Sequence, residues 1–322
     1  MSDAERHPWS DLGRRVRRAL PGRSSADAAP QPERAASRPV EMHEGRVVMR
    51  FEVGPHAFAV ASEGTEDSYV AHLGEAPLPA AVMVAGAVVP PDGVLFDVGA
   101  NIGLCAAAFA SFAPNGSVEA FEPGDRAYGD LVATVELNGY DNVRCHHTAV
   151  GAEDGSSRLL VPNWNASGAF MAGATSASAL HEGNGSVSVT EVGVRSLDSV
   201  VDELGIDRLD VLKIDVEGHE DAVLAGAART LERFRPVTVI EFNVFTLSVF
   251  VGRNPLEFLV DAVERFPHVV AVDPALRTEK VTDVPSAYDL THRCFTGGQV
   301  VDLVCSWEPL DDRLRFAGSA EG

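Results

Sequence analysis

Residues 94–103, with the sequence Val-Leu-Phe-Asp-Val-Gly-Ala-Asn-Ile-Gly, hold the pattern that decides the fold. An apolar run contains Asp97 near its end, a turn with two glycines follows, and a second apolar run begins at Leu104. This order predicts a buried strand, a tight turn and the start of a helix. Glycine lets the backbone bend sharply and lets a ligand approach where a Cβ would collide. The helix start also offers backbone N–H groups that have no intrahelical partner.

The same order of strand and helix repeats along the chain. We predict strands at 94–98, 117–121, 142–150, 157–161, 187–193, 209–214, 237–242, 268–272 and 299–305, and helices at 103–112, 125–138, 197–204, 219–234 and 255–265. Such alternation predicts an α/β fold in which helices cover both faces of a mostly parallel sheet. Ligands of these sheets bind beyond the carboxyl ends of the strands, so the residues that end strands are the candidates for a site.

The rest of the chain flanks this pattern. We predict four segments: a disordered basic arm at 1–40, a hairpin and helix extension at 41–90, a main domain at 91–310 and a tail at 311–322. Alternation of apolar and polar residues predicts a β-hairpin at 46–62, and a helix broken at two prolines is expected at 66–89. The polar residues 162–186 are expected to form a lid or a disordered loop, and a further loop is expected at 273–298.

The charge of the chain excludes some partners. The net charge is −21 over 322 residues, while the first forty residues carry eight arginines and five acids, which gives +3 and leaves −24 for the remainder. An acidic body repels phosphate backbones, so nucleic acid is not expected as a partner. The four cysteines are far apart, which favours free thiols over disulfides or zinc. No apolar run has membrane-spanning length and no signal peptide is recognised, so we expect a cytoplasmic protein.

Five predicted strand ends carry unusually polar residues. They supply Asp97, the pair Glu122-Pro123, the region of Ala149, the run Asp215-Val-Glu217-Gly-His219-Glu220, and the run Glu241-Phe-Asn243. An acid at the end of the second strand is well placed to accept hydrogen bonds from a ribose diol. The fourth strand end is the densest, because three acids and one imidazole follow a buried apolar strand within six positions. We interpret it as a functional site rather than a solvated loop.

A metal site is a weaker interpretation of the same run. The spacing Asp-x-Glu-x-His offers hard oxygen ligands and one imidazole, which several divalent metals accept. Carboxylates beside a cationic ligand need no metal, however, so we predict none. His146 and His147 could also be ligands, although a strand with one buried face explains them as well.

Four segments together resemble the FkbM family of S-adenosylmethionine-dependent methyltransferases. They are D-V-G-A-N-I-G at 97–103, A-F-E-P at 120–123, L-D-V-L-K-I-D-V-E-G-H-E at 209–220 and P-V-T-V-I-E-F-N at 236–243. The resemblance covers roughly residues 90–245. It implies a Rossmann-like class I methyltransferase fold with seven strands, the last of them antiparallel and here at 299–305. It also implies S-adenosylmethionine as cofactor and O-methylation of a sugar, polyketide-type or other small-molecule hydroxyl.

The predicted site divides between the cofactor and the acceptor. The residues expected to bind the cofactor are Asp97, Gly99, Ala100, Asn101, Gly103, Glu122, Pro123, Ala149 and Asp215. The residues expected to serve catalysis are Asp215, Glu217, His219, Glu241 and Asn243. The general base is either Asp215, favoured by position, or His219, whose unperturbed pKa lies closer to neutral pH. The remaining residues of this group are expected to orient the acceptor.

Two other functions remain open from the sequence. A nicotinamide-dependent oxidoreductase would also use Glu122 and a glycine turn, although the turn lacks the G-x-G-x-x-G spacing that holds a pyrophosphate. A catalytically silent cofactor-binding subunit would be expected to have lost residues at the fourth or fifth strand end, and all are present. The hairpin at 46–62 could pair between two subunits of a homodimer or cap its own sheet.

Overall fold

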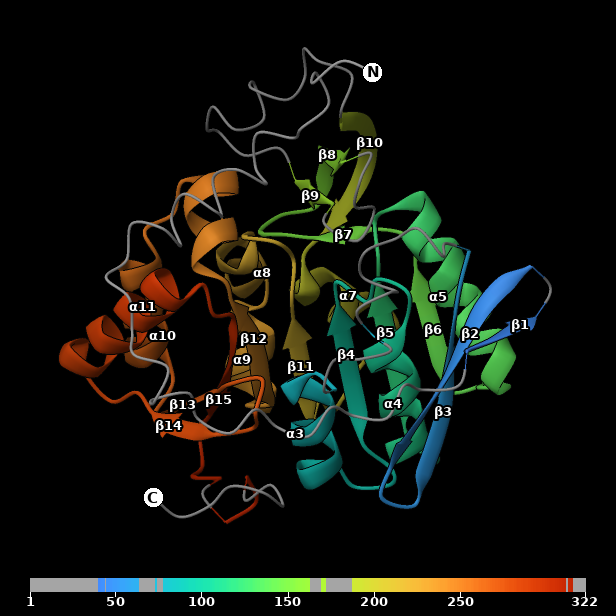
Figure 1. Ribbon diagram of the computed structural model, residues 1–322, viewed down its shortest axis with the longest axis horizontal. Coiled ribbons are helices and arrows are strands. Elements are labelled where there is room, and N and C mark those ends of the chain that lie inside the picture. Colours follow the sequence, from blue (N-terminus) through green and yellow to red (C-terminus); the bar gives the residue numbers. More distant parts are fainter. Residues whose placement is uncertain are drawn as a thin grey trace, which may run out of the picture. The chain divides into compact units, whose positions relative to one another are not determined.

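The computed structural model describes residues 40–43, 45–63, 73, 78–162, 169–171, 187–310 and 312–314 (Figure 1). Several predictions fall wholly or largely outside these ranges. They concern the basic arm at 1–40, the first part of the helix at 66–89, most of the loop at 162–186 and most of the tail at 311–322. The division of the chain into four segments stays a prediction.

An eight-stranded sheet is the main element of the described chain (Figure 1). Its strands in spatial order are β14 (Thr278–Lys280), β13 (His268–Val272), β15 (Val301–Ser306), β12 (Val237–Phe242), β11 (Val211–Ile214), β4 (Val94–Val98), β5 (Ser117–Phe121) and β6 (Val143–His146). The strands from β12 to β6 are parallel, and β15 runs antiparallel to both of its neighbours. The predicted class I methyltransferase fold with an antiparallel last strand is confirmed. The short β14 adds an unpredicted strand at the edge.

Helices cover both faces of this sheet and enclose two apolar cores. The helices are α3 (Ala80–Val88), α4 (Leu104–Phe112), α5 (Asp125–Asn138), α7 (Leu197–Leu204), α8 (Glu220–Gly226), α9 (Ala228–Phe234), α10 (Pro255–Arg265) and α11 (Val284–Gly297). Successive strand residues point to opposite faces. On β11, Val211 therefore joins the core with α3, α4 and α5, whereas Leu212 joins the core with α7 to α11.

The N-terminal extension forms a separate three-stranded sheet. It contains β1 (Val40–His43), β2 (Arg46–Val53) and β3 (His56–Ser62), so the predicted hairpin is confirmed. The backbone N–H groups of Ala59 and Ala61 on β3 donate to Asn138 Oδ1 at 2.8 Å and to Thr134 Oγ1 at 3.0 Å. Side chains of α5 therefore accept hydrogen bonds from the outer edge of β3, so the hairpin packs against a helix of its own chain.

A small sheet lies beyond the carboxyl ends of the parallel strands (Figure 1). It contains, in spatial order, β7 (Ala149–Val150), β10 (Val187–Arg195), β8 (Gly155–Pro162) and β9 (Phe170–Met171). The predicted single strand at 142–150 is wrong, because the chain turns at His147 and passes from the large sheet into the small one. A Cβ at Gly124 would lie 3.8 Å from a methyl carbon of Leu159, so β8 packs close to the end of β5.

Two further predictions are corrected. The helix expected at 219–234 is two helices that meet at Ala227, where Gly226 packs so closely on the carbonyl of Gly151 that a Cβ would lie 2.0 Å from its oxygen. The loop expected at 273–298 contains α11 as well as β14. Asp283 Oδ1 caps α11 by accepting from the N–H of Ser286 at 2.9 Å. Polar residues between its few buried positions obscured the helical pattern in the sequence.

All four cysteines lie in the described part of the chain. All four cysteines are free thiols; Cys105, Cys294 and Cys305 are buried, and Cys145 is half-buried. Within the described ranges, no helix combines the length and the apolar character needed to cross a membrane.

Candidate active site

The turn after β4 is held so tightly that only glycine fits at its first position. Gly99 has a φ of +77°, and a Cβ there would lie 1.8 Å from the carbonyl oxygen of Asp215. The N–H groups of Gly99 and Ala100 donate to the carbonyl of Phe121 at 3.0 and 2.9 Å. These contacts join the ends of β4, β5 and β11. Asn101 follows with a φ of +50°, and its buried Oδ1 has no hydrogen-bond partner.

A buried lysine lies between the first and fourth strand ends. Lys213 Nζ is 3.2 Å from Asp97 Oδ1 and 3.4 Å from Asp215 Oδ2, and it donates to the carbonyl of Gly99 at 2.5 Å. Asp97 is fully buried, whereas the Asp215 side chain is 41% exposed. Burial opposes the charge of Lys213, but the two carboxylates outweigh burial and raise its pKa well above the usual value. The lysine is therefore a permanent cation within an acidic site.

The second strand end places Glu122 against the same turn. Glu122 Oε2 accepts from the N–H of Asn101 at 2.9 Å, and Oε1 accepts from the N–H of Gly124 at 2.8 Å. Burial raises the pKa of Glu122 to about 7 despite these two donors. Pro123 separates Glu122 from Gly124 in the chain, and Gly103, with a φ of +88°, immediately precedes α4.

The fourth strand end is a strained loop rich in buried carboxyl groups. Glu217 has a φ of +54°, a backbone angle that residues other than glycine seldom adopt. Gly218 follows with a φ of +101°. Glu220 Oε1 accepts from the N–H groups of Val216 at 3.2 Å and Gly218 at 3.1 Å, which fixes the loop. Burial, followed by the charge of Asp215, raises the pKa of Glu217 to about 8. Burial also raises the pKa of Glu220 to about 7.

His219 is a neutral imidazole at the start of α8. Its Nδ1 atom is buried and has no hydrogen-bond partner. Burial lowers the pKa of His219 to about 4. The ring is therefore uncharged near neutral pH and can accept a hydrogen bond from a ligand.

The fifth strand end contributes a pair of carboxyl groups. Glu241 on β12 lies directly opposite Asp302 on β15. Burial and the nearby charges of Asp215 and Glu217 raise the pKa of Glu241 well above its usual value, and its buried Oε2 has no hydrogen-bond partner. Burial raises the pKa of Asp302 to about 7. Asn243 accepts from the backbone N–H groups of Phe245 at 3.1 Å and Thr246 at 3.4 Å, so its side-chain oxygen caps the helix that follows.

The register of the sheet explains why these groups meet. Lys213 pairs with Asp97 on one side and with Val239 on the other, so these three residues point to one face of the sheet. Glu241 points to the same face because it lies two residues from Val239, and Asp302 does so because it pairs with Glu241. Carboxyl groups from separate strands therefore lie on one face near the carboxyl ends of the parallel strands.

The third strand end differs from the prediction in its surroundings. Ala149 is buried in β7, where it pairs with Val194 of the small sheet. His146 Nε2 lies 2.7 Å from Glu119 Oε2, and His147 Nε2 lies 3.2 Å from Asp125 Oδ1. Across the described ranges, no group of three or more His, Cys, Asp and Glu side chains is arranged to hold a metal ion.

Sequence reasoning did not select Lys213, Glu220 and Asp302 as site residues. Lys213 and Asp302 share one signal, since each is a charged residue inside an otherwise apolar strand. Glu220 stands in the quoted motif, but only the structure shows that its carboxylate holds the loop.

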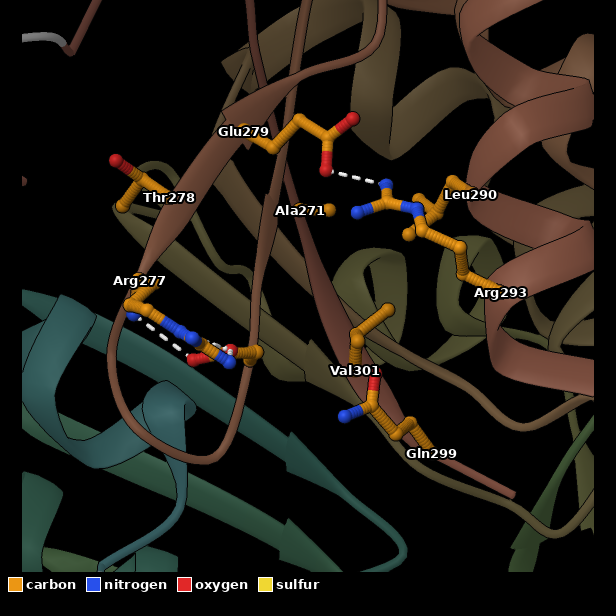
Figure 2. Close-up of a pocket in the computed structure, with 9 residues that line it drawn as sticks. Ala271, Arg277, Thr278, Glu279, Leu290, Arg293, Gln299 and Val301 are labelled. Atoms are coloured by element: carbon orange, nitrogen blue, oxygen red, sulfur yellow. Dashed lines mark hydrogen bonds and ion pairs between the residues drawn. The ribbon is translucent and has the colours of Figure 1, made fainter. Parts of the chain in front are cut away.

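A cavity lies away from these strand ends, at the edge of the sheet among β13, β14 and α11 (Figure 2). Its volume is about 300 Å³. Arg277 pairs with Asp273 at 2.6 Å, and Arg293 pairs with Glu279 at 2.5 Å across the cavity. Because each arginine already has a carboxylate partner, we assign no ligand to this cavity.

The fold and the strand-end site define an S-adenosylmethionine-dependent methyltransferase. The Methyltransferase FkbM domain model matches residues 97–269, which is more than half of the chain. The chain therefore belongs to the FkbM methyltransferase family, and the oxidoreductase alternative is set aside.

Individual relatives agree with this family. The chain is 27% identical over 206 residues to the 2-O-methyltransferase NoeI of Sinorhizobium fredii, a match covering 59% of this chain and 82% of NoeI. It is 28% identical over 154 residues to Methyltransferase 1 of Beauveria bassiana, which covers 42% of this chain and 59% of that protein. The crystal structure of Methyltransferase FkbM from Methylobacillus flagellatus matches with 17% identity and a TM-score of 0.34, over 54% of this chain and 42% of that one. That structural similarity is too low to bear on the site.

The residues present fit S-adenosylmethionine. The cofactor is a sulfonium cation with a ribose diol, and the site offers buried carboxylates and the unpartnered Asn101 Oδ1 as acceptors. The turn at Gly99 lacks the glycine spacing that cradles a pyrophosphate, and this cofactor has no phosphate. These acceptor groups and this turn therefore suit a cationic nucleoside rather than a dinucleotide.

Proposed function

We propose that this chain transfers the methyl group of S-adenosylmethionine to a hydroxyl oxygen of a small molecule, such as a sugar or natural-product acceptor. The observation that supports this most is the group of carboxylates around Lys213, together with the buried, unpartnered Nδ1 of His219 on the loop that follows the same strand. The similarity to NoeI, which is a 2-O-methyltransferase, supports oxygen as the acceptor atom.

In this proposal the residues of β4 and β5 hold the cofactor. Asp97, Gly99, Ala100, Asn101 and Gly103 form its binding turn. Glu122 and Pro123 meet the ribose, Ala149 approaches the adenine through its backbone, and Asp215 lies near the methyl group. When bound, the cofactor supplies an electrophilic methyl group. The protein positions the two reactants, which can lower the barrier by about 7–11 kcal/mol.

Residues of the fourth and fifth strand ends orient the acceptor. His219 accepts the hydroxyl hydrogen through its unpartnered Nδ1, and Glu217, Glu241 and Asn243 fix the acceptor around it. A hydroxyl that gains a methyl group becomes strongly acidic, so even a base with a pKa of about 4 can take its proton. Because Asp215 is paired with Lys213 whereas His219 Nδ1 has no hydrogen-bond partner, we favour His219 over Asp215 as the proton acceptor, and Asp215 remains the neighbour of the methyl group.

Transfer of isotope-labelled methyl to a pool of hydroxyl compounds, followed by mass spectrometry, tests the proposal. We expect His219→Ala to lower the rate of transfer by about 10²–10⁴-fold without weakening cofactor binding. We expect Asp215→Ala to abolish transfer while the fold is kept. His292→Ala, on the exposed face of α11, is a matched control that should leave the rate unchanged. Full activity of both site variants would reject the assignment, and label found only on nitrogen or carbon would reject O-methylation.

A further inference from the structure

Three phenylalanines form a cluster just beyond Asn243. The rings of Phe170 and Phe250 stack with a centroid distance of 4.0 Å and an interplanar angle of 15°. Phe245 meets Phe250 edge to face at 5.6 Å. Phe250 belongs to the short π-helix η2 (Thr246–Val251), and Phe245 immediately precedes this helix. Phe170 belongs to β9. The cluster thus joins the end of β12 to the small sheet above the strand ends.

One side of this cluster is open. Phe170 is buried, but Phe245 is 50% exposed and Val249 is 39% exposed. These two residues lie four positions apart, about one helical turn. Large apolar side chains that are exposed together often mark a binding surface.

This open surface is continuous with the candidate site. Asn243 Oδ1 accepts from the N–H of Phe245 at 3.1 Å. A Cβ at Gly218 would lie 2.9 Å from the carbonyl oxygen of Thr246, so η2 begins directly against the loop that carries Glu217 and His219. The polar groups proposed to orient the hydroxyl and the apolar surface therefore lie on adjoining segments.

We propose that Phe245 and Val249 bind an apolar part of the methyl acceptor, so that the acceptor is a hydroxyl compound bearing an aryl or alkyl group rather than a bare sugar. This inference rests on the proposed function. The carboxyl groups and imidazole of the site hold the hydroxyl end. Burial of an aryl or alkyl group against Phe245 supplies binding energy away from the reacting atoms, which orients the hydroxyl.

Glycosides with matched sugars test this inference. Methyl, octyl and 4-nitrophenyl glycosides of several sugars are titrated calorimetrically into the complex of the full-length protein with S-adenosylhomocysteine. We expect the octyl and 4-nitrophenyl compounds to bind at least tenfold more tightly than the methyl glycosides. Phe245→Ala should weaken the apolar probes about tenfold and leave the affinity for S-adenosylhomocysteine unchanged. Phe295→Ala removes a 69% exposed ring on α11 and should change neither affinity.

The outcomes separate this inference from the proposed function. Equal affinity for apolar and methyl glycosides, or an unchanged preference in Phe245→Ala, overturns the apolar site even if methyl transfer to oxygen is observed. Phe245-dependent binding of the apolar probes without any O-methylation supports the apolar surface and counts against the proposed function. A change of oligomeric state in Phe245→Ala would assign the surface to a second copy of the chain and overturn the inference.

Discussion

The two halves of the strand-end site differ in how their polar groups are satisfied. On the β4–β5 side, Glu122 accepts two backbone N–H groups and Asp97 faces Lys213, although Asn101 Oδ1 is buried without a hydrogen-bond partner. On the β11–β12 side, His219 Nδ1 and Glu241 Oε2 are buried without a partner. Buried polar atoms without partners are rare and call for an explanation. We infer that a ligand completes both halves, whereas backbone donors and Lys213 leave the first half the more preorganised of the two.

The largest expected effect comes from removing the cation that the two halves share. Lys213→Met leaves Asp97 buried without a counter-ion, which typically costs about 3–5 kcal/mol of stability, and it should abolish cofactor binding. Denaturant unfolding and calorimetric titration with S-adenosylmethionine measure both effects. The only other lysine of the chain provides the control, because Lys280→Met on the exposed strand β14 should change neither. Normal cofactor binding by Lys213→Met would show that the halves do not depend on this charge.

A smaller but still large effect is expected from the turn of the preorganised half. Gly99→Ala would force a Cβ into the carbonyl of Asp215 at a φ of +77°, so we expect a loss on the order of 1–3 kcal/mol and greatly weakened cofactor binding. Gly129→Ala in α5 meets no atom within 4 Å and should stabilise the protein by about 0.5–1 kcal/mol. Thermal unfolding of both variants compares them. Equal effects of the two substitutions would contradict the tight turn.

The raised carboxyl pKa values predict that stability falls with rising pH. Glu122 has a pKa of about 7 in the folded chain against a usual value of 4.5, so the folded state holds its proton more tightly than the unfolded state. The stabilising contribution is fully present below pH 4.5 and is lost as the pH rises through 7. For this one buried group, the loss is on the order of 3 kcal/mol.

Thermal unfolding of the cofactor-free protein between pH 5 and pH 8.5 measures this dependence. Glu122→Gln should flatten the decline. Because a cationic ligand favours ionised carboxylates, binding of S-adenosylmethionine at pH 7 should release protons, which calorimetry in two buffers of different ionisation enthalpy detects. Stability that rises over this pH range would contradict the assignment of raised pKa values.

The smallest expected effect lies outside both halves. Asn138→Ala removes hydrogen bonds to the N–H and the carbonyl of Ala59 on β3, at 2.8 and 2.7 Å, and should cost about 1–2 kcal/mol. The rate of methyl transfer should not change. Glu136→Ala, an exposed position of the same helix, is the control and should stay within about 0.5 kcal/mol of the parent protein. A loss of activity in Asn138→Ala would extend the site to the N-terminal extension.

Local patterns predicted most of the elements. The strand at 94–98 and the helix at 125–138 have the predicted bounds, because apolar periodicity and glycine signals are strong there. The helix α11 was missed since its buried positions are few, and the strand at 142–150 was predicted as one because nothing in its sequence marks the change of sheet. The predicted roles of individual site residues stay predictions until the variants above are measured.

The sequence by itself determined that carboxylates follow buried strands and that a glycine turn lies after the first of them, because burial and backbone conformation depend on residue type and spacing. Only the tertiary structure decided which of these groups meet. Asp97 and Lys213 are 116 positions apart in the chain, as is every other pair of residues that β4 and β11 align. The pairing of these two strands nevertheless places Lys213 Nζ 3.2 Å from Asp97 Oδ1. The antiparallel pairing of β15 with β12 likewise places Asp302 opposite Glu241. Strand order and register are properties of the whole sheet, so no local pattern could supply them.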